Sequence, residues 1–161
     1  MEKQMLSNFT YDELQVGQIG EYQKTLTERE IILFAAASGD TNPIHMDEEY
    51  AKSTPFGGRI AHGIWTASLI SAAVANVMPG PGSIYLGQTL KFSRPVKIGD
   101  TITIQLEILE KNDKRKRVSI QCTGTNQEGK QIISGVADVQ APTEKLSLEI
   151  PTLPNIEIAD A

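Results

Sequence analysis

An aspartate and a histidine lie five positions apart in the segment SGDTNPIH, which runs from Ser38 to His45. A carboxylate and an imidazole that contact the same water molecule can remove a proton from it and return a proton elsewhere. Histidine suits this work because its unperturbed pKa is about 6.5, and an aspartate in a partly dry cleft acts as acid or base according to its surroundings. The Asn-Pro turn between Asp40 and His45 would let the two side chains converge.

The same pattern has a purely structural explanation. Asp40 could be the first residue of an Asx turn, and His45 could be a capped histidine at the surface. The local pattern does not decide between water activation and turn formation, so both interpretations stay open at this point.

A second segment that could take part in catalysis is RIAHG, from Arg59 to Gly63, which leads into an apolar helix. The first N–H groups of a helix lack intrahelical acceptors and lie at the positive end of the helix dipole. The Gly63 N–H could therefore stabilise a developing oxyanion, which is commonly worth on the order of 3 kcal/mol in the transition state. Taken alone, the pattern favours a glycine that permits a tight helix entry. His62 is expected to pack or to cap.

Ser71 lies two turns into the same helix. Its hydroxyl could orient a water or Asp40, but a bond back to the carbonyl four residues earlier is the simpler expectation. The sequence has no Gly-rich phosphate loop and no nucleophile elbow. Two histidines and one cysteine are too few for a convincing metal site, so we expect no metal.

The helices that must position these residues can be predicted from the chain. Thr27-Glu-Arg-Glu30 is a capping box that starts a helix, and Gly39 fits its end, which places Asp40 just past a helix C-terminus. A short helix is predicted from Asp47 to Ala51. The segment from Gly63 to Met78 carries no charge on any side and should be a helix that is buried all round.

Apolar residues alternate after this helix, as they do in strands that are covered on one face. Strands are predicted at about 84–92, 102–108, 117–122 and 132–140, with an early one at about 19–26. The fold class is therefore α+β, with a strongly curved antiparallel sheet wrapped around one apolar helix. A helix this apolar needs more cover than one sheet supplies, so we expect a homodimer or a higher homo-oligomer.

Length and composition limit the classes of protein. The 161 residues suffice for one domain, which we place at 1–142, and the proline-containing segment 143–161 is expected to be a tail or linker. The net charge of -5 and a single short basic run at a turn give no reason to expect nucleic-acid binding. No stretch is long and apolar enough for a bilayer. The lone Cys122, which is expected to be buried and inert, fits a reducing cytoplasm.

Three segments, taken in order, carry a resemblance to a known family. SGDTNPIHMDEEYA, FGGRIAHG and GSIYLGQTLKFSRPVKIGDTI resemble the MaoC-like, (R)-specific enoyl-CoA hydratases, and the likeness runs over about residues 16–141. The resemblance implies a hotdog fold, a dimer, and the reversible hydration of a trans-2-enoyl-CoA to an (R)-3-hydroxyacyl-CoA. It favours the catalytic interpretation of Asp40 and His45.

The resemblance also implies roles for single residues. Asp40 and His45 match the pair that activates one water, and Gly63 matches the glycine of the oxyanion hole. Asn42 matches the asparagine that shapes the turn, and Ser71 matches a serine near the catalytic pair.

Coenzyme A would be the carrier of the substrate, and no cofactor is implied. Its phosphates would favour a basic rim, for which Arg59, Lys91 and Arg94 are candidates, and Trp65 is a candidate for shaping the acyl pocket. Two alternatives remain. One is a hotdog thioesterase that hydrolyses an acyl-CoA, and the other is an acyl-CoA-binding module of a larger phosphate acyltransferase assembly.

Overall fold

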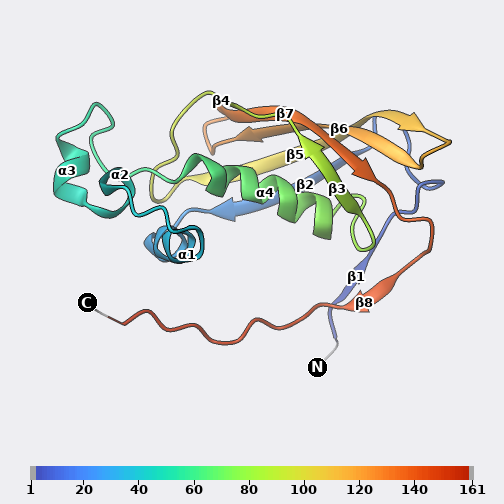
Figure 1. Ribbon diagram of the computed structural model, residues 1–161, viewed down its shortest axis with the longest axis horizontal. Helices are drawn as coiled ribbons and strands as arrows, with labels where there is room; N and C mark the ends of the chain where they lie inside the picture. Colours follow the sequence, from blue (N-terminus) through green and yellow to red (C-terminus); the bar gives the residue numbers. More distant parts are fainter. Residues whose placement is uncertain (1–2, 160–161) are drawn as a thin grey trace.

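A curved antiparallel sheet wraps around one long helix, α4 (Gly63–Asn76), in the computed structural model of the protein (Figure 1). The structure describes residues 3–159. The strands follow the spatial order β2-β5-β6-β7-β3, and β4 also pairs with β7. Their bounds are β2 Ile19–Thr25, β3 Ile84–Gln88, β4 Lys91–Phe92, β5 Thr101–Asn112, β6 Arg117–Thr125 and β7 Gln131–Gln140. The α+β architecture expected from the sequence is confirmed.

The central strands bury one face each, as their alternation predicts. Ile102, Ile104, Leu106 and Ile108 of β5 are fully buried, whereas the residues between them are partly or fully exposed. Cys122 of β6 belongs to the same buried layer, and burial raises the pKa of its thiol to about 11. The expected burial of Cys122 is therefore confirmed, and a protonated, enclosed thiol is a poor nucleophile.

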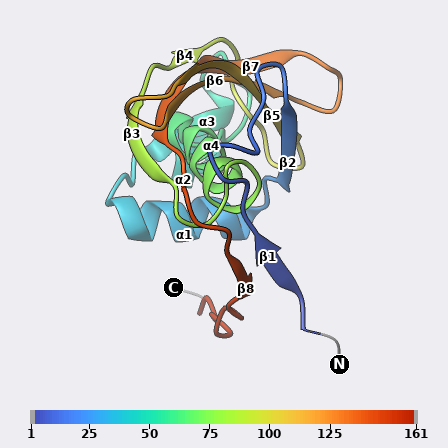
Figure 2. The same cartoon turned by 90° about the vertical axis from the view of Figure 1, so that its right-hand side faces the viewer.

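Helix α4 lies under the concave face of this sheet, as the end-on view in Figure 2 shows. Trp65, Leu69, Ile70 and Ala73 are buried in the core. The expectation that α4 is buried all round is wrong for the single chain, because the sheet covers only one side of it. The opposite side is open, and Ile64 there is 57% exposed.

Three short helices precede α4. Helix α1 (Glu28–Ser38) starts at Thr27, whose side chain accepts a hydrogen bond from the Glu30 N–H, and it ends at Gly39 with a φ of 79°. The carboxylate of Glu30 lies 3.4 Å from the Lys24 ammonium, so only half of the predicted capping box is seen. Helix α3 (Glu48–Lys52) confirms the predicted short helix, and α2 (Pro43–Met46) is an addition that the sequence did not indicate.

Residues 143–161 were expected to form a tail or linker. Part of this segment is instead paired with the start of the chain. Strand β8 (Ser147–Glu149) pairs antiparallel with β1 (Met5–Ser7) in a separate two-stranded sheet. The buried Asn8 strengthens this junction, because its side chain donates to the Glu144 carbonyl and accepts from the Leu146 N–H. Regular secondary structure ends with β8, and residues 151–159 have none.

The part of the chain that the structure describes contains no helix that is both long and apolar enough to cross a membrane.

Gly135 of β7 provides a test of the sheet's close packing. A Cβ atom there would lie 1.8 Å from the carbonyl oxygen of Thr89, because the backbone at Thr89 lies directly against Gly135. We expect Gly135→Ala to lower the free energy of unfolding by about 3 kcal/mol, because backbone has to move to make room.

Gly58→Ala, away from β3, is the control, since its added Cβ would meet only the end of the flexible Glu48 side chain, at 3.3 Å. Its free energy of unfolding should stay within about 0.5 kcal/mol of the original. Urea denaturation measures both changes, and equal stabilities of the two variants would contradict the close approach at Gly135.

Candidate active site

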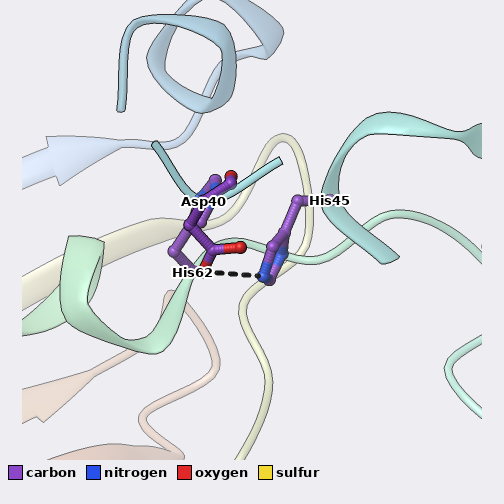
Figure 3. Close-up of side chains that lie close together, drawn as sticks. All are labelled: Asp40, His45 and His62. Atoms are coloured by element: carbon purple, nitrogen blue, oxygen red, sulfur yellow. Dashed lines mark hydrogen bonds and ion pairs between the residues drawn. The ribbon is translucent and has the colours of Figure 1, made fainter. Parts of the chain in front are cut away.

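Three short pieces of chain meet at one end of α4 (Figure 3). Asp40 follows α1, His45 lies in α2, and His62 immediately precedes α4. The Oδ2 atom of Asp40 lies 3.9 Å from the Nε2 atom of His45. The turn therefore brings the two side chains together, with Asp40 half-exposed and His45 almost enclosed.

The turn itself is held by both of its polar side chains. Asp40 Oδ1 accepts a hydrogen bond from the Asn42 N–H at 3.2 Å, which forms an Asx turn. Asn42 Oδ1 in turn accepts from the Ile44 N–H at 3.1 Å and caps α2. The structural and the chemical interpretations of Asp40 are thus compatible, because one carboxylate oxygen forms the turn and the other faces His45.

The orientation of His45 is set by its second ring nitrogen. Nδ1 lies 2.8 Å from the carbonyl oxygen of Ile60. A carbonyl oxygen only accepts hydrogen bonds, so Nδ1 carries a hydrogen and Nε2 of the neutral ring has a free lone pair. That lone pair is on the nitrogen that faces Asp40.

The distance between Asp40 and His45 suits a shared water better than a direct contact. At 3.9 Å the two atoms are too far apart for a hydrogen bond. Two acceptors that each bind one hydrogen of a single water, at ordinary lengths, stand roughly 4.5 Å apart. A carboxylate and a neutral imidazole in this arrangement can polarise one water and accept a proton from it.

Gly63 presents a backbone donor beside this pair. It is the first residue of α4, and its N–H has no acceptor among residues 3–159. Gly63 and His45 both line a cavity of about 370 Å³ whose other walls are mostly apolar and include Phe56, Thr66 and Phe92. An apolar cavity with a few convergent polar groups is the usual form of a small-molecule site.

Comparison with known proteins decides the family. Residues 13–130 match the family described as MaoC like domain. The chain belongs to this family. It is 43% identical to an (R)-specific enoyl-CoA hydratase of Rhodospirillum rubrum, with 82% of this chain and 91% of that one covered. It is 39% identical to a 3-hydroxybutyryl-CoA dehydratase of Methylorubrum extorquens, over 84% of this chain and 85% of the relative.

A solved structure agrees over almost the whole MaoC-like chain. The unliganded R-hydratase PhaJ1 from Pseudomonas aeruginosa superposes with a TM-score of 0.94 and 52% identity, covering 97% of this chain and 100% of that one. The hotdog fold that the sequence motifs implied is therefore confirmed.

The three candidate cations of the MaoC-like site have different surroundings. Arg94 lines the cavity and donates to the Gln131 carbonyl at 2.8 Å. Lys91 is exposed on β4 but is not part of the cavity wall. The expectation of Arg59 at the rim is corrected, because its side chain is only 11% exposed. Its guanidinium nitrogens lie 2.7 Å from a carboxylate oxygen of Glu28 and 3.4 Å from one of Glu48, so it is not an exposed rim residue.

Two further predicted residues are not brought to the cavity. Ser71 is exposed on the open side of α4, about 12 Å along the helix axis from Gly63 at 1.5 Å per residue. In the single chain Ser71 therefore does not line the cavity, whereas the resemblance implied a serine near the catalytic pair. Trp65 faces the opposite way and is buried in the core rather than in the cavity wall.

Thr66 and Phe92 are among the cavity-lining residues that the sequence reasoning missed. Thr66 is buried one turn after Gly63, and this spacing was an available signal. Phe92 comes from β4, and its ring would lie 3.2 Å from a Cβ added at Gly63. No local pattern links a residue of that strand to the start of α4.

The site has three groups that could approach a metal ion. Donor atoms of Asp40, His45 and His62 lie within 4.8 Å of one another. However, the two imidazoles stack at 3.8 Å with only 26° between their planes. Nitrogen lone pairs lie in the ring planes, so those of two nearly parallel rings do not converge on one ion, and the arrangement fits a structural or catalytic metal poorly.

Proposed function

We propose that this MaoC-like protein is an (R)-specific enoyl-CoA hydratase. It adds water reversibly to a trans-2-enoyl-CoA and gives an (R)-3-hydroxyacyl-CoA. The observation that carries the proposal is the 3.9 Å pair of Asp40 and His45, together with the cavity that His45 shares with the free amide of Gly63. The coenzyme A carrier follows the similarity to the (R)-specific enoyl-CoA hydratase of Rhodospirillum rubrum, and the stereochemistry follows both this relative and the R-hydratase of Pseudomonas aeruginosa.

The chemistry follows from the positions of these three groups. Asp40 and His45 hold one water, whose oxygen attacks C3 of the enoyl chain while His45 Nε2 takes one of its protons. The C3–O bond forms, and the electron pair of the double bond moves into the thioester as an enolate. The Gly63 N–H stabilises the charge on the carbonyl oxygen. The protonated His45 then returns the proton to C2, which completes the addition.

No external electron source is needed in this sequence, because the thioester itself accepts the electron pair and releases it again. We therefore propose that the enzyme works without a metal or an organic cofactor. Coenzyme A enters and leaves as part of the substrate, and Arg94 is the one candidate cation placed at the cavity to meet its phosphates.

The assignment is tested with crotonyl-CoA in buffer that contains a chelator. The wild-type protein should consume the enoyl absorbance without releasing free thiol, whereas free thiol would indicate a thioesterase, and no reaction would indicate a binding module. Asp40→Asn and His45→Gln should each lower kcat at least about 100-fold, since general acid–base groups contribute roughly 10²–10⁴.

Glu49→Gln is the control for these substitutions. It also replaces a surface carboxylate by an amide, but Glu49 lies on the outside of α3, where its ion pair among residues 3–159 is with Lys52. Its kcat should equal that of the wild type. Full activity in Asp40→Asn or in His45→Gln would remove that residue from the mechanism.

We also propose that the chain forms a homodimer through the open edge of its sheet and the open side of α4. Strand β3 pairs with β7 on one side only, and Ile84, Tyr85 and Leu86 of β3 are all exposed. The exposed Ile64 of α4 lines the same shallow surface as Leu86. An unpaired edge strand with adjoining apolar side chains is a ready surface for a second copy, and twofold pairing would cover both at once. Ser71 follows Ser68, which lines this surface, by about one helical turn.

Leu86→Glu should convert this dimer to monomer, because the substitution places a charge in the apolar contact. Leu109→Glu in β5 is the matched control, since Leu109 is 38% exposed and Leu86 is 42% exposed. Analytical ultracentrifugation measures both. A wild-type monomer, or the same assembly state in both variants, would contradict the proposed interface.

A further inference from the structure

His62 is buried at a position where packing alone does not require a polar side chain. It is only 2% exposed, and its Nδ1 atom is buried without a hydrogen-bond partner among the described residues. Its side chain does not cap α4, although the residue stands at the cap position. A phenylalanine or leucine would fill a buried site without leaving a polar atom unpaired. The presence of a histidine therefore calls for a reason beyond packing.

The contacts of His62 supply such a reason. Its Nε2 atom lies 2.8 Å from the backbone carbonyl oxygen of Asp40, and its ring stacks on the ring of His45 at 3.8 Å. Phe34 packs against it as well, with ring centroids 4.9 Å apart. One side chain thus touches both members of the acid–base pair, and Figure 3 shows the three side chains close together.

The hydrogen bonds determine the form of the ring. The Asp40 carbonyl can only accept, so His62 carries its hydrogen on Nε2. A second proton on Nδ1 would create a charged donor that is buried and unpaired, which is costly. The ring of His62 thus donates to the Asp40 backbone while it stacks on His45, and the proton taken from water is held by His45.

We propose that His62 is a positioning residue of the hydration site. Its Nε2–H fixes the backbone of Asp40, and its ring fixes the plane of His45, so that the two acceptors keep the separation that one water can bridge. The inference rests on the proposed hydratase function, and it assigns His62 no direct contact with the substrate.

Three substitutions separate the two contacts. His62→Phe keeps a ring for His45 but loses the donor to Asp40, and His62→Gln keeps a donor near the Nε2 position but loses the ring. His62→Leu loses both. We expect kcat for crotonyl-CoA to fall about 10-fold in each of the first two and about 100-fold in the third, since small misplacements of reacting groups cost up to about 10². KM should stay within about twofold because substrate binding is untouched.

The melting temperature distinguishes positioning from a structural role. His62→Phe removes a buried unpaired nitrogen together with one hydrogen bond, so its melting temperature should stay close to that of the wild type although its kcat falls. Phe34→Leu is the control, because it weakens the packing around His62 without touching either contact of the pair. It should lower the melting temperature and leave kcat within about twofold. A wild-type kcat in His62→Leu, or a kcat that falls only in step with the melting temperature, would overturn the proposal.

A spectroscopic measurement does not depend on the proposed function. The chain has only two histidines, so their ring nitrogens can be assigned by ¹⁵N NMR on the wild type and His62→Gln. We expect His45 as the Nδ1–H form and His62 as the neutral Nε2–H form. A hydrogen on Nδ1 of His62 near neutral pH would overturn the positioning role even if the wild type is an active hydratase. An inactive wild type with the expected spectrum would instead overturn the proposed function.

Discussion

The hydrogen bond between His45 Nδ1 and the Ile60 carbonyl, 2.8 Å long, determines what the site can do. It decides which nitrogen of the imidazole carries a hydrogen, and it leaves the other free to face Asp40. The same segment is fixed at two further points, because Ile60 N–H donates to the Ile44 carbonyl and Ala61 N–H donates to the Val96 carbonyl. Since this segment leads directly into α4, the acid–base pair and the amide of Gly63 are held as one unit.

The rest of the fold explains how a site built largely from short connecting segments can hold its groups in a fixed geometry. Asp40 lies in a turn and His45 in the one-turn helix α2, and this segment is anchored by hydrogen bonds and by the end of α1. The long helix α4 is fixed by its buried side against the sheet, so its first amide has a defined direction and position. Catalytic groups on loops over a rigid scaffold are the common arrangement in enzymes.

Local features of this protein were predictable, whereas contacts between distant segments were not. Thr27 and Gly39 mark the ends of α1, and the spacing of Asp40 and His45 led to the pair, because each depends on neighbours within a few residues. The ion pairs that enclose Arg59 come from two other helices, and β1 and β8 meet from opposite ends of the chain. No periodicity within a short window carries that information. The role of His62 was missed for the same reason, since its two key contacts belong to other elements.

A crystal structure of the wild-type protein with (R)-3-hydroxybutyryl-CoA bound would test the central geometry most directly. The account predicts that the 3-hydroxyl oxygen lies within about 3 Å of both the Asp40 carboxylate and His45 Nε2, and that the thioester carbonyl accepts from the Gly63 N–H at a similar distance. A hydroxyl that touches only one of the two side chains, or a carbonyl that is turned away from Gly63, would contradict it.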